Sequence, residues 1–362
     1  MTAVIFIIVL AALIFVHELG HFIAARACGI RVDAFKLGFG PRIFSWKKGE
    51  TEYGVNWLPF GGYVRIHGED PDKEAESGPD AGRSFVNKPR WQQAIVLAAG
   101  VLMNFAFAWL LYVAVFSIGV TATTDGFEQY ADKFKDPRIM VTTTLPGSPA
   151  ALAGLKDGDI IVSVNGQKLA DVTAIQNAIN DNGAKPASFE YIRGGAAQHA
   201  DITPKAGLVE GKYAIGIALD QVANMRLPLI PAMKEGFSYT IGSIEQTVIG
   251  LYGFVAGIVG GHADFSQVSG PIGIAGIVGD AAAMGISYLL MVTAVISINL
   301  GVINLVPFPA LDGGRILFVA IEGVIRRRIP AGFANITNMI GFALLMILML
   351  AVTWKDVARL IK

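Results

Sequence analysis

Four stretches of this chain are apolar for about 20 residues, the length that an α-helix needs to cross the hydrocarbon core of a bilayer. They cover residues 4–25, 94–120, 286–306 and 336–352. Hydrophobic residues make up 53% of the chain and charged residues 16%, whereas about a quarter of a soluble domain is charged. The sequence therefore predicts a polytopic α-helical membrane protein with about four transmembrane helices.

The charges of the chain balance, with 29 Lys and Arg against 29 Asp and Glu, so nothing indicates a nucleic-acid partner. The single cysteine, Cys28, excludes an internal disulfide and a cysteine-rich zinc cluster. The first apolar stretch lacks the basic residues that precede a signal-peptide core, and it is too long for one. We expect it to be retained as the first span. The acidic run at residues 69–76 is typical of a solvated loop.

Two segments between the spans have a different character. Residues 35–66 are rich in glycine and alternate, as in Tyr53-Gly54-Val55-Asn56-Trp57, which predicts strands and turns. Residues 122–221 are mixed and strand-rich, and Asn165-Gly166 is a strong hairpin-turn signal. The run SPAALAGLKDGDIIVSVNGQKL at 148–169 resembles a bacterial PDZ domain. A generic small β-domain is the alternative.

Residues 229–261 are apolar enough to span a membrane, but Lys234, Glu235 and Glu245 interrupt them. We therefore expect a helix that lies on the membrane surface. Lys and Arg concentrate in the 26–90 loop and in the block 326–328. Four spans place both segments on the cytoplasmic side, as the positive-inside rule requires, whereas a fifth span would separate them.

This topology predicts four parts of the chain, which can be described by their residue numbers. Residues 1–120 form an N-terminal membrane core that includes the β region 35–66. Residues 122–221 form a PDZ-like domain on the extracytoplasmic side, 222–285 a membrane-surface helical linker, and 286–362 a C-terminal membrane core.

The first span contains the ionisable run His17-Glu18-Leu19-Gly20-His21. On a helix, His17 and His21 share one face one turn apart, so two imidazoles can take two corners of a tetrahedral zinc site. Glu18 lies beside them and can accept a proton from a water molecule activated there. Ionisable groups inside an apolar span are costly unless they are paired or bind a metal. The alternative is a buried polar cluster that bonds to neighbouring helices.

A catalytic zinc ion needs a third protein ligand and an open position. The candidate is Asp312, in the run Asn304-Leu305-Val306-Pro307-Phe308-Pro309-Ala310-Leu311-Asp312-Gly313-Gly314. Its prolines break the third helix, and such irregular backbone is tolerated at membrane depth only under cover of protein or a wet cavity. With the amino terminus outside, His17 lies about 20 Å below the start of its span, and the third helix descends about 30 Å before its break. The two segments can therefore meet near the cytoplasmic side.

Several motifs together resemble the site-2 protease family, particularly the bacterial regulator-of-sigma-E protease type. They are HELGH at 17–21, FGGYV at 60–64, Gly100-x-x-x-Asn104-Phe105, the PDZ-like segment, SGPIGI at 269–274, and NLVPFPALDGG at 304–314. The resemblance covers nearly the whole chain. Two departures are the room for a single PDZ-like domain and Arg315, where many relatives have histidine.

The resemblance implies a set of site residues. His17, His21 and Asp312 would hold one zinc ion per chain, and Glu18 would be the general base. Substrate-handling roles would fall on Asn304, Pro307, Pro309 and Asn299. Residues 35–66 would be a β-hairpin that dips into the membrane and offers a strand edge to an unwound substrate. Gly61 and Gly62 would then allow close approach, although a plain turn is the alternative.

The implied activity is zinc-dependent hydrolysis of peptide bonds in or near transmembrane segments of single-span proteins, such as an anti-sigma factor or remnant signal peptides. The protein would be a multi-pass protein of the bacterial inner membrane, in contact with lipid, and the PDZ-like domain would bind peptide or protein segments. Two alternatives remain. One is a membrane-anchored PDZ adaptor whose zinc site is structural or vestigial, which a closed fourth ligand would favour. The other is a metal transporter, which would carry several intramembrane carboxylates and histidines along a path.

Overall fold

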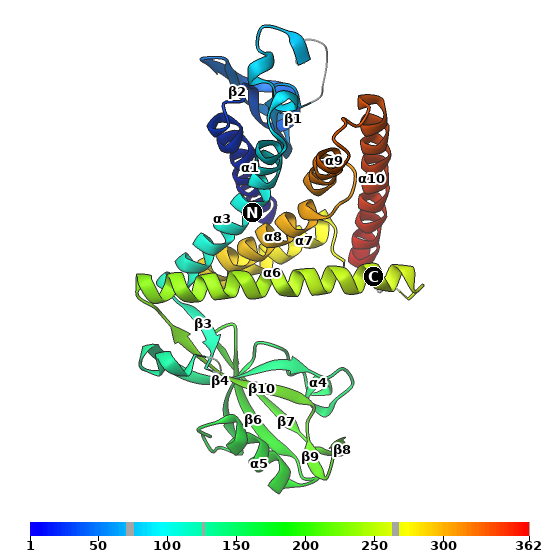
Figure 1. Ribbon diagram of the computed structural model, residues 1–362. Helices are drawn as coiled ribbons and strands as arrows, with labels where there is room; N and C mark the ends of the chain where they lie inside the picture. The colour runs from blue at the N-terminus through cyan, green and yellow to red at the C-terminus, as the bar shows by residue number, and fades with distance from the viewer. Residues whose placement is uncertain (70–75, 125–126, 263–267, 362) are drawn as a thin grey trace. The chain divides into compact units, whose positions relative to one another are not determined.

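The computed structural model describes residues 1–69, 76–124, 127–262 and 268–361, so most of the acidic run at 69–76 lies outside the described residues. The chain forms two compact units (Figure 1). A membrane unit combines Met1–Val115 with Leu229–Lys362, and a soluble unit consists of Phe116–Pro228. Each unit has its own hydrophobic clusters.

Helices dominate the membrane unit. They are α1 (Thr2–Ala27), α3 (Arg90–Ile118), α6 (Leu229–Val259), α7 (Pro271–Met284), α8 (Ile286–Leu305), α9 (Asp312–Ile325) and α10 (Ala331–Ile361). By length and composition, five of the described helices could cross a membrane, namely α1, α3, α6, α8 and α10. The sequence predicts four, and the additional candidate is α6, the stretch predicted to lie on the membrane surface.

The strands predicted within residues 35–66 are present as β1 (Val32–Lys48) and β2 (Thr51–Ile66), an antiparallel pair. Both strands bend back, because Phe35 pairs with Val64 near the end of β2 and also with Tyr53 near its start. The inner end of the pair is buried against α1 and α3, in a cluster that contains Phe35, Val64 and Val96. The far end exposes large side chains, among them Phe44 and Trp57.

A short connection leads from β2 to α3 through the turns η1 (Ala81–Arg83) and η2 (Phe85–Asn87). Arg31, which follows α1, donates a hydrogen bond to Asp80 at 2.7 Å. This bond lowers the pKa of the Asp80 carboxyl group, because the guanidinium favours its charged form. Phe85 is buried in the same cluster as Phe35, so the part of the connection before α3 is held at Asp80 and at Phe85.

The soluble unit is built on a six-stranded sheet of order β3-β10-β4-β5-β6-β7. Its elements are β3 (Val120–Thr123), η3 (Glu128–Lys133), β4 (Phe134–Thr144), α4 (Pro149–Leu152), β5 (Ile160–Val164), α5 (Val172–Asn182), β6 (Ala187–Arg193), β7 (Ala196–Ile202), β8 (Lys205–Val209), β9 (Lys212–Ala214) and β10 (Ile217–Met225). Strands β8 and β9 form a separate hairpin. Asn165 and Gly166 both have positive φ, as a two-residue hairpin turn requires.

Local signals explain the helix starts in this unit. Ser148 caps α4 and accepts a hydrogen bond from the Ala151 amide, while Pro149 takes the first helical position. Asp171 caps α5 and accepts from the Ala174 amide at 2.7 Å. One face of α5 then packs Ile175 and Ile179 into the core of the sheet.

One charged pair lies inside this unit. Asp159 is 1% exposed and accepts two hydrogen bonds from Arg193, at 2.7 and 2.6 Å, and a third from the Lys156 amide at 2.8 Å. Three donors replace the water that the carboxylate loses on burial. A buried charge that loses its partner is strongly destabilising.

We therefore expect Arg193→Ala to destabilise the soluble unit by about 3 kcal/mol. Hydrogen exchange of amides in β5 and β6, measured on the full chain in detergent, should show protection reduced by a factor of about 100. Arg138→Ala, an exposed arginine on β4, is the control. A change of less than about threefold in the Arg193 variant would mean that the pair is not needed for stability.

Candidate metal centre

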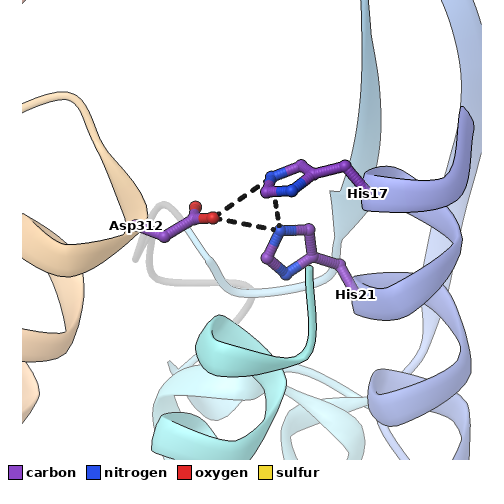
Figure 2. Close-up of side chains that lie close together, drawn as sticks. All are labelled: His17, His21 and Asp312. Carbon is purple, nitrogen blue, oxygen red and sulfur yellow. Dashed lines mark hydrogen bonds and ion pairs between the residues drawn. The ribbon is translucent and has the colours of Figure 1, made fainter. Parts of the chain in front are cut away.

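Three side chains from the two ends of the chain converge in the membrane unit (Figure 2). His17 and His21 come from consecutive turns of α1, and Asp312 is the first residue of α9. Asp312 Oδ2 lies 3.2 Å from His17 Nε2 and 3.3 Å from His21 Nε2, and the two Nε2 atoms are 3.2 Å apart. Within the described residues, no other His, Cys, Asp or Glu joins this group.

These distances are those of a tetrahedral zinc site. Zinc bonds of about 2.0–2.1 Å at tetrahedral angles separate neighbouring ligand atoms by about 3.3 Å. The three atoms form a nearly equilateral triangle with sides of 3.2–3.3 Å. Asp312 Oδ2 is also buried and receives no hydrogen bond. Two imidazole nitrogens and a carboxylate oxygen at these distances from one another are suited to a zinc ion with a fourth position left open.

Two residues of helix α3 lie within hydrogen-bonding distance of the Nδ1 atoms of the two imidazoles. His21 Nδ1 lies 2.8 Å from the Val96 carbonyl oxygen. A carbonyl can only accept, so Nδ1 carries the proton, and Nε2 of the neutral ring keeps its lone pair. His17 Nδ1 lies 3.1 Å from the side-chain amide of Asn104, which is fully buried.

The space for the two rings depends on Gly100. A Cβ atom at this position would lie 2.3 Å from His21 Nε2 and 2.8 Å from His17 Cε1. On the facing helix, a Cβ at Gly20 would lie 2.3 Å from the Ala99 carbonyl oxygen. Two glycines thus let α1 and α3 approach closely where the imidazoles lie.

Glu18 lies on the same helix as the two histidines and faces the β-hairpin. Its carboxylate accepts a hydrogen bond from the Val64 backbone of β2. A Cβ at Gly62 would lie 3.4 Å from Glu18 Cγ and 2.9 Å from Ile14 Cγ2. Gly62 and Glu18 are therefore neighbours, and the hairpin reaches the centre through backbone rather than side chains.

Asp312 is presented by a chain that doubles back on the end of α8. A Cβ at Gly313 would lie 2.3 Å from the carbonyl oxygens of Leu305 and Val306, so only glycine fits there. Ala310 has a φ of 74°, and its amide donates to Asn338 Oδ1 of α10 at 3.2 Å. The proline and glycine run thus fixes a tight turn, which sets the position of the carboxylate.

Ion pairs join this part of the membrane unit to the segment between α1 and α3. They are Glu69–Arg315, Arg90–Glu322 (2.7 Å) and Glu76–Arg328 (3.1 Å). Arg315 lies one turn after Asp312 on α9. The position at which many relatives have histidine therefore carries a cation whose partner, Glu69, lies just beyond the end of β2.

The residues predicted to handle substrate lie in three places: the end of α8 with the loop that follows it, an earlier part of α8, and the β-hairpin. Asn304 lies in the last turn of α8, and Pro307 and Pro309 lie in the loop that leads to Asp312. Asn299 lies further back on α8, where its Oδ1 accepts a hydrogen bond from Thr247 of α6 at 2.8 Å. Gly61 has a φ of 109° and abuts the Phe39 ring.

Sequence reasoning named Gly100 and Asn104 only as parts of a motif and gave them no role. The spacing of Val96, Gly100 and Asn104 was a usable signal, because residues four apart share one face of a helix. That face meets the imidazoles. The role of the Val96 carbonyl has no sequence signal, since every residue carries one.

Comparisons with known proteins agree with this chemistry. The model of Peptidase family M50 matches residues 5–348. A putative zinc metalloprotease of Clostridium perfringens is 35% identical, over 96% of this chain and 96% of its own length. The regulator of sigma-W protease RasP of Bacillus subtilis is 32% identical, over 99% of each chain.

Among solved structures, the chain is similar to the PDZ domain of an SdrC-like protein from Listeria monocytogenes. The identity is 26%, the match covers 22% of this chain and 85% of that chain, and the TM-score is 0.21.

We expect Gly100→Ala to lower the zinc content of the purified chain at least about tenfold, because the methyl group would displace both imidazoles. Elemental analysis measures the content directly. Gly276→Ala on α7, where a Cβ meets nothing within 4 Å, should leave the zinc content unchanged. Equal zinc contents in the two variants would show that Gly100 does not shape the centre.

Proposed function

Because the chain belongs to peptidase family M50, the site-2 protease family of zinc metalloendopeptidases, we propose that its zinc ion is held by His17, His21 and Asp312. With Glu18 as general base, this centre hydrolyses peptide bonds in or near the transmembrane segments of single-span membrane proteins. The observation that supports this most strongly is the convergence of three lone-pair atoms at 3.2–3.3 Å from one another, on helices apolar enough to cross a membrane.

The roles of the residues follow from their positions. When bound, zinc supplies Lewis acidity, which polarises a carbonyl group and lowers the pKa of a water molecule. Glu18 accepts the proton of the attacking water and returns it to the amine that leaves. The Val64 backbone donates a hydrogen bond to the Glu18 carboxylate, so the proposed base lies against β2. Asp312, ionised, contributes one negative charge, while the two imidazoles stay neutral.

Substrate must reach this centre as an extended segment, because the amides of a helix are bonded within the helix. The edge of β2 near Gly62 lies beside Glu18, so a segment added to this edge would pass the base. The far end of the hairpin exposes aromatic side chains, with Trp57 68% and Phe44 61% exposed. We propose that these rings contact lipid, as aromatic residues do at membrane interfaces.

The ion pairs support a topology with four spans. Glu69, Glu76 and Arg90 lie between α1 and the start of α3, and their partners follow α8. Segments that pair in this way lie on one side of the membrane, so an even number of crossings separates them. Helices α3 and α8 supply two crossings, and a crossing by α6 would make three. In Figure 1, α6 also runs crosswise to α10, as a helix in the membrane plane would.

With this topology the protein is a multi-pass protein of the bacterial inner membrane, and its soluble unit lies on the extracytoplasmic side. We propose that this unit is the PDZ-like domain. A groove of about 400 Å³ lies between α5 and the start of β10, lined by Asn177, Ile179 and Leu219 among others. Residues 217–221 of β10 pair with β4, and β3 pairs only with the later residues of β10. Among the described residues, 217–220 have no strand partner on the side of β10 opposite β4, and this edge can accept a peptide strand from a substrate.

The name of the B. subtilis relative describes it as a regulator of a sigma factor. For this chain we propose a single-span anti-sigma factor as substrate, with remnant signal peptides as a second group. Both present one transmembrane segment without further spans, which is the form of substrate that the β2 edge can receive.

We expect Glu18→Gln to reduce cleavage of a model single-span substrate at least about 100-fold while the zinc content stays unchanged, because the amide cannot accept the proton. Gel analysis of the purified chain with substrate in detergent measures the rate. Glu245→Gln, an exposed glutamate on α6, is the matched control. Cleavage by the Glu18 variant within threefold of the parent would refute the assigned base.

Labelling of single cysteines tests the four-span topology in a Cys28→Ser background. A membrane-impermeant thiol reagent added to intact spheroplasts should label Glu210→Cys in the soluble unit and leave Gly82→Cys and Arg327→Cys unlabelled. All three positions are exposed. Labelling of Arg327→Cys together with Glu210→Cys would mean that α6 crosses the membrane.

A further inference from the structure

A neutral imidazole binds a metal through one nitrogen only when its other nitrogen carries the proton. For His21 the Val96 carbonyl fixes that proton on Nδ1. Among the described residues, no backbone carbonyl forms a hydrogen bond with His17 Nδ1, whose partner is a side chain. Its Nδ1 faces the side-chain amide of Asn104 at 3.1 Å, across 87 positions of sequence.

The orientation of the Asn104 amide decides whether His17 can be a ligand. With the amide nitrogen facing His17, that nitrogen donates to Nδ1, and the ring proton must sit on Nε2. A protonated Nε2 would then point at Asp312 Oδ2, 3.2 Å away, and could not bind zinc. In the same orientation Asn104 Oδ1 is buried and has no hydrogen-bond donor.

The two ends of a carboxamide have nearly the same shape, so one pocket accommodates either orientation, and the protons select between them. We propose that Asn104 Oδ1 accepts the proton of His17 Nδ1 and thereby keeps the Nε2 lone pair free for zinc. Asn104 is thus a positioning residue for the metal centre. The inference rests on the proposed function, since it takes His17 as a ligand.

The surroundings of Asn104 fit this role. The residue is 0% exposed, and a buried amide is costly unless it forms hydrogen bonds. Its backbone carbonyl accepts from Ser297 Oγ of α8 at 2.8 Å, which fixes α3 at this point against the helix that leads to Asp312. Val96, Gly100 and Asn104 then form one stripe along α3. The Val96 carbonyl accepts from His21 and Asn104 Oδ1 accepts from His17, while Gly100 leaves room for both rings.

Two substitutions separate the acceptor role from the donor role. Asn104→Asp keeps an oxygen that can accept from His17 and removes the donor. Asn104→Leu has a similar size and neither function. We measure the zinc dissociation constant of the full-length protein in detergent by competition with a chelator of known affinity. The Leu variant should bind zinc about 10–100-fold more weakly than the parent, and the Asp variant within about threefold of it.

Two results would overturn the proposal: a Leu variant that binds within threefold of the parent, or an Asp variant as weak as the Leu variant. The second result would mean that the amide donates to His17. Asn335→Leu, the same change at an exposed position of α10, is the matched control. Thermal unfolding of the metal-free proteins separates loss of zinc affinity from loss of fold. If the Leu variant does not fold, the Asp variant alone decides between acceptor and donor.

His17→Ala distinguishes failure of this inference from failure of the proposed function. If His17→Ala binds zinc as tightly as the parent, the proposed ligand set is wrong. If it loses zinc while both Asn104 variants bind normally, the ligand set stands and only the role of Asn104 is refuted.

Discussion

The structure of the membrane unit depends on the meeting of His17, His21 and Asp312. Ionisable side chains inside an apolar span are costly unless each is paired or bound to a metal. We propose that one shared cation satisfies all three converging atoms at once, which a hydrogen bond or ion pair between any two of them does not. Several other features follow from this requirement. Glycines let α1 and α3 approach, and the chain after α8 turns sharply to present a carboxylate.

The same requirement links the two ends of the chain. The histidines belong to α1 and the aspartate to α9, so the centre exists only when both halves of the membrane unit are assembled. Ion pairs such as Arg90–Glu322 join the two halves of the membrane unit. The hydrogen bond from Ser297 Oγ to the Asn104 carbonyl joins α8 to α3. The hairpin joins the same assembly through the bond between Val64 and Glu18. Glu18, the edge of β2 and the three converging side chains therefore belong to one assembly.

Local signals made much of this predictable from the sequence. The i, i+4 spacing of His17 and His21 places them on one helix face, and the prolines around Asp312 mark a broken helix at membrane depth. The glycine-rich alternation of residues 35–66 predicted strands, but not that Phe35 would pair with both Tyr53 and Val64. Features that depend on contacts between distant segments of the chain could not be predicted from the sequence. Asn299, which the resemblance places among the substrate-handling residues, accepts a hydrogen bond from Thr247. The side-chain amide of Asn104 forms a hydrogen bond with His17, 87 positions earlier in the sequence.

Zinc K-edge X-ray absorption on the purified parent and Asp312→Ala proteins tests the centre most directly. The height of the edge gives the zinc bound per chain, and multiple scattering counts the imidazoles. We predict one zinc per parent chain with two imidazoles at about 2.0–2.1 Å and no sulfur ligand, and a large loss of zinc from the variant. A parent spectrum without two imidazoles, or an Asp312→Ala protein with the zinc content and spectrum of the parent, would contradict the assignment of this centre.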